Sequence, residues 1–317
     1  MALAAEEVTL FRATPPLGVI LFARNIASPE QVRALADAIR DLLGAEAPVL
    51  VDQEGGRVAR LRPPHWPAFP PAAAFEHLSA DATAANAALL GLACRAAGFD
   101  VACAPVLDLR LPGAHGIIGD RAFSAAPAEV ARLGAAWVRG LQSAGCIPVI
   151  KHIPGHGRAL VDSHLDLPRV SASRAELAAD LTPFAALAGS GAWAMTAHIV
   201  YEALDPTLPA TLSPAVIAGI IRGEIGFDGV LVSDDLAMQA LRGAPGALAT
   251  QSIAAGCDLV LHCTGVLAET AAALAGCPAL AEHTAIRLAA ARATARPQAL
   301  DPAALLALRD AELAAAA

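Results

Sequence analysis

The sequence predicts an α/β protein built as a single-domain (β/α)8 TIM-like barrel in which one strand is irregular or missing. Seven short segments are hydrophobic throughout instead of alternating between polar and apolar residues, which is typical of parallel strands covered on both faces. A longer, helical stretch follows each of them, without a break in composition along the 317 residues. An open, doubly wound parallel sheet is the alternative architecture.

The expected strands are the short β-branched runs of this pattern. Each is short enough for a strand and is bounded by turn or capping residues. In chain order they are expected at residues 17–23, 48–52, 101–107, 146–152, 192–198, 229–233 and 257–263.

Capping residues and glycines delimit the helices between these strands. Ser28, with Pro29 at the first helical position, begins the first helix, and Gly98, Gly145 and Gly226 end three others. A short helix is expected between the last two strands. The other helices are expected at residues 28–43, 85–97, 127–144, 173–188, 213–225 and 266–275.

The C-terminal part of the chain contains no evident eighth strand. The region after Gly276 is helical in pattern throughout, which predicts a helical tail from about residue 280. The alanine-rich end, from about Asp301, is expected to be a terminal helix that packs on the outside. Residues 1–317 are therefore expected to form one domain.

Charge and hydropathy exclude several classes of protein. The chain has 22 Lys and Arg against 30 Asp and Glu, a formal charge of −8, which excludes broad electrostatic binding to nucleic acid or to anionic membranes. Its hydrophobic content of 56% excludes disorder. The mean hydropathy is +0.52, but the longest uncharged stretch, residues 181–201, is interrupted by proline, glycine and polar residues and does not resemble a membrane span.

The N-terminus and the cysteines indicate a cytoplasmic protein. Glu6 and Glu7 lie in an N-terminal segment without the basic residues of a secretory signal. The six cysteines have no CxxC spacing, and although their even number allows three disulfides, six reduced and buried thiols are expected. A monomer is expected, with a small molecule as its partner.

Polar residues follow nearly every expected strand. Because the carboxyl ends of parallel strands meet at one mouth of a barrel, these side chains should face the same site, at the end that carries chemistry in barrel enzymes. They are Arg24, Asn25, Asp52, Asp108, Lys151, His152, His198, Asp234, Asp235 and His262.

Two polar loops are suited to a polyhydroxylated ligand. In DQEGGRVAR, residues 52–60, paired glycines permit a tight backbone while Asp52 and Arg60 supply hydrogen-bonding groups. The alternative for this loop is a structural turn with a surface ion pair. In GDRAFS, residues 119–124, Arg121 is a candidate substrate clamp, although an Asp–Arg contact that staples the loop is an equal alternative for Asp120.

A histidine-rich segment follows the fourth strand. Lys151 and His152 lead into a Gly/Pro loop, after which Asp162 precedes His164 by two residues. A carboxylate at this spacing can orient an imidazole and stabilise its protonated form, as a general acid–base requires. A metal site using Lys151, His198 and Asp234 is an alternative, but the early His-x-His of such sites is missing, so no metal or cofactor is expected.

The sixth strand ends in Ser233-Asp234-Asp235. An aspartate delivered into a barrel mouth by a rigid strand is well placed to act as a covalent nucleophile or electrostatic stabiliser. Asp235 is the better placed of the two to cap the following helix. Asp234 is therefore the candidate nucleophile.

The ordered set of motifs resembles one known family. The motifs are LFARN (21–25), DQEGGRVARL (52–61), APVLDL (104–109), IIGDRAFS (117–124), KHIPGHG (151–157), DSH (162–164), SDDLAM (233–238) and AGCDLVLHC (255–263). Together they resemble the glycoside hydrolase family 3 β-N-acetylglucosaminidases of bacterial peptidoglycan recycling. The likeness covers roughly residues 17–263 and departs from the commonest pattern at Ile153, where phenylalanine is usual.

The resemblance implies a retaining exo-β-N-acetylhexosaminidase. Such an enzyme would remove non-reducing terminal GlcNAc from GlcNAc-1,6-anhydroMurNAc, with or without peptide, in the cytoplasm. In this family Asp234 would match the nucleophile, and His164 with Asp162 would match the acid–base. The absence of room for a second domain after Cys263 favours the short, single-domain type. The sugar-binding positions would match Asp52, Arg60, Arg121, Lys151 and His152.

Other activities remain compatible with these residues. An imidazole acid–base does not repel phosphate as a glutamate would, so a phosphorylase is an alternative, as is a catalytically silent amino-sugar-binding protein. Because His164 lies on a loop and Asp234 ends a strand, we expect the acid–base to reach the sugar by loop closure.

Overall fold

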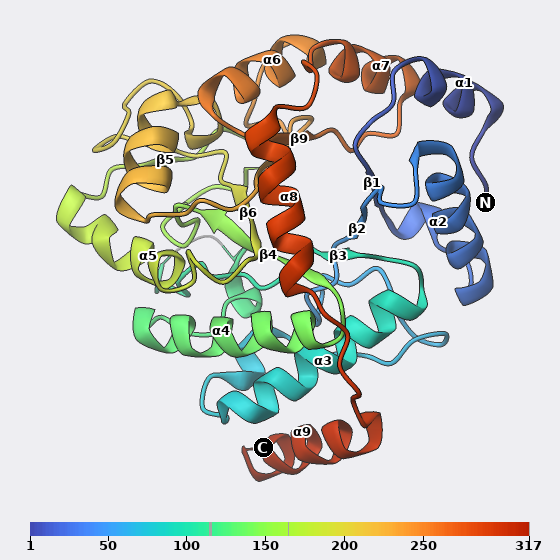
Figure 1. The fold of residues 1–317 in the computed structure, drawn as a ribbon. Coiled ribbons are helices and arrows are strands. Elements are labelled where there is room, and N and C mark those ends of the chain that lie inside the picture. The colour runs from blue at the N-terminus through green and yellow to red at the C-terminus, as the bar shows by residue number, and fades with distance from the viewer. Residues whose placement is uncertain (114–115, 164, 317) are drawn as a thin grey trace.

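Seven parallel strands form the central sheet of the protein (Figure 1). The computed structural model describes residues 1–113, 116–163 and 165–316. Neighbouring strands in the sheet are also neighbours in the chain, apart from two short strands that lie outside it. The sheet contains, in order, β1 (Val19–Leu21), β2 (Val49–Val51), β3 (Val101–Ala102), β4 (Ile147–Ile153), β6 (Trp193–Thr196), β8 (Leu231–Asp235) and β9 (Leu259–Leu261).

The sheet curves into a nearly closed barrel. Just beyond β1 and β9, which are its two edge strands, Arg24 Nη2 donates a hydrogen bond to the carbonyl of Cys263 at 2.6 Å. Helix α1 (Ala5–Ala13) contacts both α2 (Pro29–Leu43) and α7 (Leu267–Ala275), which bridges the first and last helices around the sheet. This arrangement confirms the predicted TIM-like barrel.

In the described part of the chain, helices take the place of an eighth strand after β9. Helix α8 (Glu282–Thr294) crosses the strands in Figure 1 and inserts Leu288 and Ala291 into the apolar cluster inside the barrel, which includes Val101 and Trp193. The inside of the barrel at that end is therefore filled by side chains rather than open.

The remaining helices surround the sheet and mostly follow the sequence prediction. Ser28 accepts the expected capping hydrogen bond from Gln31 N, and Ser173 accepts a similar one from Glu176 N. The other helices are α3 (Ala80–Ala96), α4 (Pro127–Ser143), α5 (Arg174–Ala186), the π-helical η5 (Ala215–Glu224), α6 (Pro245–Ala255) and α9 (Pro302–Ala316).

Several elements differ from the expectation. Helix α3 begins five residues earlier than predicted, because Ser79 accepts a hydrogen bond from Ala82 N and caps it there. Strand β3 is only two residues long, although backbone hydrogen bonds to β4 continue beyond it, from Val149 N to the Ala104 carbonyl and from Lys151 N to the Pro105 carbonyl. The sequence analysis missed α1 and the separate pair of two-residue strands β5 (Arg169–Val170) and β7 (Val200–Tyr201).

The tail helix packs on the outside, as predicted. Helix α9 lies against α3, where Glu312 accepts hydrogen bonds from the amide and hydroxyl of Ser79 at 2.7 and 2.5 Å. All six cysteines are free, as expected, but only four are buried, whereas Cys263 and Cys277 are half-buried.

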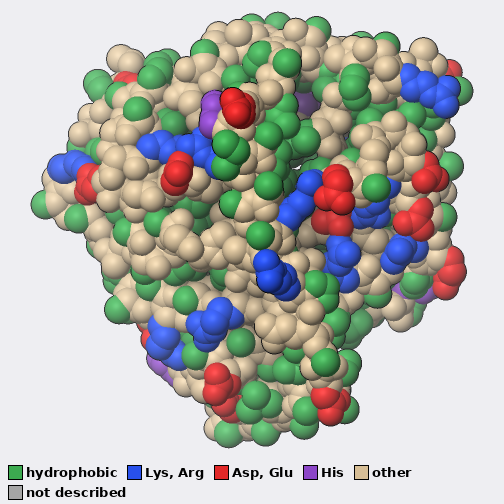
Figure 2. Space-filling view, viewed as in Figure 1, with side chains coloured by type: hydrophobic (Ala, Val, Ile, Leu, Met, Phe, Trp, Pro, Cys, Tyr) green, Lys and Arg blue, Asp and Glu red, His purple; other side chains and the backbone are tan. Residues whose placement is uncertain are grey.

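The surface on the face shown in Figure 2 mixes acidic and basic side chains among apolar ones. Within the described ranges, none of the helices combines the length and the apolar character that a bilayer crossing requires.

Candidate active site

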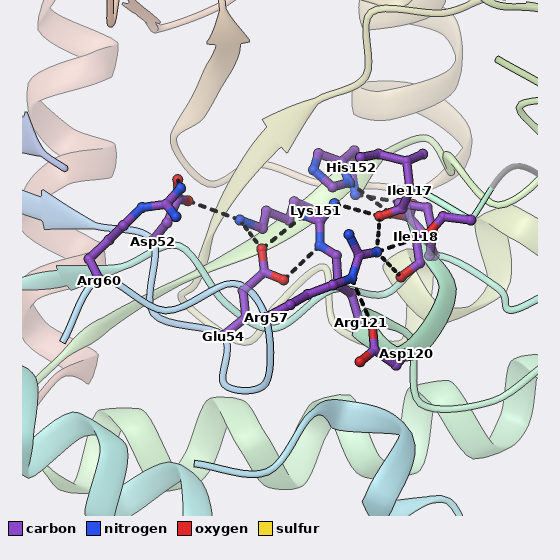
Figure 3. A network of polar contacts seen from close by, with 12 residues as sticks. Asp52, Glu54, Arg57, Arg60, Ile117, Ile118, Asp120, Arg121, Lys151 and His152 are labelled. Carbon is purple, nitrogen blue, oxygen red and sulfur yellow. Dashed lines mark hydrogen bonds and ion pairs between the residues drawn. The ribbon is translucent and has the colours of Figure 1, made fainter. Parts of the chain in front are cut away.

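The predicted polar residues meet at the carboxyl ends of the strands. Asp52 follows β2, Lys151 and His152 lie in β4, and Asp234 lies in β8. The register between β4 and β6 shifts between Lys151 and Ile153, an irregularity of the kind that redirects side chains at the rim of a barrel. Two consecutive residues of one strand, Lys151 and His152, thereby both join the polar groups drawn in Figure 3.

A chain of ion pairs runs across this mouth (Figure 3). Asp52 lies between two cations, with Oδ2 3.0 Å from Arg60 Nη2 and Oδ1 3.2 Å from Lys151 Nζ. Lys151 Nζ is also 2.6 Å from Glu54 Oε1. Glu54 in turn receives Arg121 Nε and Nη2 at 2.8 and 2.9 Å. Four of the five sugar-binding candidates therefore belong to one connected network.

Burial makes this network electrostatically strong. The side chains of Lys151 and Glu54 are only 3% and 6% exposed. Burial opposes the charge of Glu54, but Arg121 and Lys151 outweigh it and hold the pKa of the carboxyl far below its usual range. Burial likewise opposes the charge of Lys151, and Glu54 and Asp52 overcome it to raise the pKa of the ammonium group. Glu54 and Lys151 are therefore both ionised at neutral pH.

Glu54 is the member of the network that the sequence analysis did not single out. Asp52 and Glu54 are two residues apart just beyond the end of β2, the spacing at which extended residues share a face. That spacing is the signal that could have identified it.

The loop that carries Arg121 is held by a different arginine. Arg57 Nε lies 2.9 Å from Asp120 Oδ1, and its Nη2 donates to the carbonyls of Gly116, Ile117 and Ile118. Asp120 therefore has the structural role given above as its alternative, an Asp–Arg contact that holds the loop. Its partner is Arg57, which lies outside this loop.

His152 is held by a buried carboxylate. Asp108 Oδ2 lies 2.7 Å from His152 Nδ1, and the side chain of Asp108 is fully buried. Its Oδ1 accepts hydrogen bonds from the amides of His156 and His152 at 2.6 and 3.2 Å. The sequence analysis placed Asp108 at this mouth but did not include it among the site residues.

A small cavity of about 110 Å³ lies next to the ion-pair network. Asp234 lines it, and Asp234 Oδ1 accepts a hydrogen bond from the amide of Asp235 at 2.8 Å. Burial opposes the charge of Asp234, yet His152 and His198 outweigh it and lower the pKa of this carboxyl. The other residues along the cavity are Ile20, Phe22, Asp52, Arg60, Met195, Asp235, Met238, Leu261 and Cys263.

The neighbouring Asp235 and His198 support the backbone. Asp235 Oδ1 accepts hydrogen bonds from the amides of Ala237 and Cys263, both at 3.0 Å, but it caps no helix, because turns follow β8 and the next helix, α6, begins at Pro245. His198 is engaged through both ring nitrogens, by Thr211 Oγ1 at 2.7 Å and the Asp235 carbonyl at 3.0 Å. Across residues 1–113, 116–163 and 165–316, no group of three or more His, Cys, Asp or Glu side chains is arranged to hold a metal ion.

The predicted acid–base segment reaches the same region. His164 itself lies outside the described residues, and Asp162 is half-buried. Between them, Ser163 is buried, with its Oγ 3.2 Å from His156 Nε2. The Ser163 carbonyl accepts a hydrogen bond from the amide of Ala240, which lies on the segment after β8.

The fold and the site together define a barrel enzyme. Its strand ends carry ion pairs beside a cavity that is lined by an ionised aspartate, Asp234, an arrangement suited to chemistry on a small polar molecule. Residues 5–295 match the glycosyl hydrolase family 3 N terminal domain. The chain belongs to this family and is a glycoside hydrolase, which confirms the family expected from the motifs.

Similar proteins and solved structures support the same family assignment. The chain is 46% identical to a beta-hexosaminidase of Alkalilimnicola ehrlichii, over 82% of this chain and 77% of that one. It is 41% identical to a beta-hexosaminidase of Pseudomonas aeruginosa, over 82% and 79%. The native NagZ structure from Neisseria gonorrhoeae superposes with a TM-score of 0.84 at 34% identity, covering 99% of this chain and 93% of that one.

A longer relative also matches. The family 3 beta-N-acetylglucosaminidase from Paenibacillus sp. str. FPU-7 gives a TM-score of 0.81 at 35% identity, over 95% of this chain. This chain spans 61% of the length of that structure. The chain thus lies in the part of family 3 whose relatives are named beta-hexosaminidases and beta-N-acetylglucosaminidases.

Proposed function

We propose that the protein is a retaining exo-β-N-acetylhexosaminidase that acts as one catalytic domain. Its substrate would be GlcNAc-1,6-anhydroMurNAc, with or without attached peptide, from which it removes the non-reducing terminal GlcNAc. The names of the relatives support the sugar, and the six free cysteines are compatible with a cytoplasmic reaction. The observation that carries the proposal is the ionised carboxylate of Asp234 along a cavity lined by Asp52 and Arg60.

The proposed reaction proceeds in two steps with Asp234 as nucleophile. Its carboxylate attacks the anomeric carbon and forms a glycosyl–aspartate ester, while the glycosidic oxygen leaves with a proton from the imidazolium of His164. The neutral imidazole then takes a proton from water, which attacks the anomeric carbon and releases both GlcNAc and Asp234. The lowered pKa of Asp234 supports this role because a nucleophile must be unprotonated at neutral pH.

The ion-pair network is proposed to bind the sugar. Arg60, Lys151 and Arg121 each contact a carboxylate, so their charges are compensated while their remaining N–H groups can donate to hydroxyl oxygens. The Asp52 carboxylate can accept from a hydroxyl in the same way. His152, at the end of β4, is proposed to contact the same sugar.

The first test is the release of p-nitrophenol from its β-GlcNAc glycoside. We expect Asp234→Ala to abolish turnover and His164→Ala to slow it strongly. Asp37→Ala, at an exposed carboxylate of α2, is the control and should leave the rate unchanged. Near-normal turnover by Asp234→Ala would exclude the proposed nucleophile.

Two further assays separate the alternatives. In phosphate buffer, hydrolysis yields GlcNAc, whereas a phosphorylase would yield GlcNAc-1-phosphate, and binding without any product would indicate a sugar-binding protein. Aryl β-glycosides that differ only at the 2-position, carrying acetamide or hydroxyl, measure whether the enzyme selects N-acetylhexosamines. We expect free GlcNAc as product and a preference for the acetamide.

A further inference from the structure

Asp108 is a buried carboxylate that contacts His152 at the end of β4 and His156 in the loop that follows. Its side chain is fully buried, one oxygen lies 2.7 Å from His152 Nδ1, and the other accepts the amides of His152 and His156. The carboxylate thus binds both the side chain and the backbone of His152, which lies at the same mouth of the barrel as Asp234.

These contacts determine which nitrogen of His152 carries the proton. Burial opposes the charge of Asp108, but His152 and His156 outweigh it and lower the pKa of the carboxyl, so it is ionised. An ionised carboxylate can only accept hydrogen bonds, and Nδ1 must therefore be the N–H donor. The two nitrogens lie on opposite edges of the ring, so Nε2 is directed away from Asp108.

We propose that Asp108 is a positioning residue that holds His152 in the Nδ1–H tautomer and presents Nε2 to the sugar beside Asp234. The proposal rests on the proposed function for its sugar but not for the tautomer itself. His152 in β4 and Asp234 in β8 lie at the same mouth of the barrel. With Nδ1–H donated to Asp108, Nε2 is the nitrogen left to accept a hydrogen bond from a sugar hydroxyl.

The surroundings of His152 leave the ring little freedom to turn over. Its side chain is 7% exposed, and its ring packs edge-to-face on that of His156 at 5.5 Å between centroids. His156 is itself held at Nε2 by Ser163 Oγ. A flip of His152 would move Nδ1 away from Asp108 and leave the buried Asp108 oxygen without its hydrogen-bond donor.

The tautomer can be measured directly in the resting wild-type protein. In two-dimensional ¹⁵N–¹H spectra of ¹⁵N-histidine-labelled enzyme, we expect His152 to show a protonated Nδ1 and an unprotonated Nε2. His152→Gln assigns the signals by their loss. The opposite pattern, with protonated Nε2 and unprotonated Nδ1, would overturn the proposal whatever the enzyme hydrolyses.

Substitution of Asp108 tests whether the tautomer matters for the reaction. We expect Asp108→Asn to shift His152 toward the Nε2–H form and to lower kcat/KM by roughly 10–100-fold, the usual cost of losing a partner that orients a functional histidine. Asp258→Asn is the matched control, because Asp258 is equally buried and accepts the amide of Leu231, but lies away from the cavity. That control should destabilise the fold while leaving the His152 tautomer unchanged.

A double-mutant cycle separates positioning from support of the backbone. In the His152→Gln background, Asp108→Asn should have little further effect on kcat/KM, because the residue through which it acts is already gone. An equal loss in both backgrounds would contradict the proposal and leave Asp108 a purely structural role. If Asp108→Asn does not fold, the spectrum of the wild-type protein alone decides which tautomer His152 adopts. An active Asp234→Ala enzyme would refute only the proposed function.

Discussion

Glu54 holds the guanidinium of Arg121 through two parallel contacts, Nε–Oε2 at 2.8 Å and Nη2–Oε1 at 2.9 Å. The same Oε1 lies 2.6 Å from Lys151 Nζ. One carboxylate therefore positions two of the cations proposed to bind the sugar. Because a bidentate pair fixes the plane of a guanidinium, Glu54 also determines which Arg121 N–H groups remain available to a ligand.

Replacing Glu54 should disturb binding and stability together. Glu54→Gln leaves Lys151 and Arg121 buried with less compensating charge, and we expect it to lower the free energy of unfolding by about 3–5 kcal/mol. KM for the aryl β-GlcNAc glycoside should rise as well, because both cations lose their orientation. Urea denaturation and steady-state kinetics measure the two effects.

The control for this prediction is Glu129→Gln. Glu129 pairs with Arg132 one helical turn away on the surface of α4, where an ion pair contributes about 0–1 kcal/mol. The structural interpretation of Glu54 would be wrong if Glu54→Gln were no more destabilising than this control.

Arg57 should affect the enzyme through the loop that it anchors. Arg57→Ala removes the contacts to Asp120 and to three loop carbonyls that precede Arg121. Allowing for the solvent exposure of Arg57, a net weakening of about 1 kcal/mol corresponds to a roughly fivefold rise in KM, with kcat retained. Arg33→Ala, in an exposed pair on α2, should change neither constant, and an unaltered KM in Arg57→Ala would contradict the anchoring role.

His156 should make the stability of the protein depend on pH in mild acid. Burial, and then the neighbouring His152, lower the pKa of His156 from 6.5 to about 4. Between these values the unfolded chain binds a proton that the folded chain does not, so the free energy of unfolding falls as the pH is lowered. The slope from this one group is at most about 1.4 kcal/mol per pH unit.

Chemical denaturation at several pH values checks this prediction. His156→Gln should flatten the dependence between pH 6.5 and 4, because it removes the group that is protonated only on unfolding. His65→Gln, at an exposed histidine, should retain it. Identical slopes in wild type and His156→Gln would show that His156 is not the group responsible.

Asp258 should support the fold without taking part in the reaction. Its oxygens accept hydrogen bonds from Thr284 and Arg287 of α8, from the amide of Leu231 and from Arg222, so it fastens α8 across the barrel. Asp258→Asn should cost about 3–5 kcal/mol of stability, the usual result of breaking a buried ion pair. The kcat of the folded fraction, measured well below the melting temperature, should be unchanged.

The comparison for Asp258 is Asp228→Asn. Asp228 also pairs with Arg287, but its side chain is 87% exposed, and its loss should cost about 0–1 kcal/mol. If Asp258→Asn lowered the free energy of unfolding as little as Asp228→Asn, the contacts of Asp258 with α8 would not stabilise the fold.

The sequence by itself determined the barrel and the location of its site. Runs such as residues 17–23 and 146–152 are hydrophobic throughout, a local pattern that specifies buried parallel strands, and the capping serines specify where helices begin. Because all parallel strands point the same way, Asp52, Lys151 and Asp234 had to share one mouth. The ordered motifs also predicted the family of the protein, and the match to the family 3 domain confirms it.

Only the tertiary structure decided which of these charges meet. The pairs Glu54–Arg121, Arg57–Asp120 and Asp108–His152 join residues that are 44 to 67 positions apart, and no local pattern encodes such contacts. The strands β5 and β7 could not be predicted from the sequence, because two residues are too few to show a pattern of hydrophobicity. Periodicity reports the burial of a segment, whereas hydrogen bonds across the mouth depend on the closure of the whole barrel.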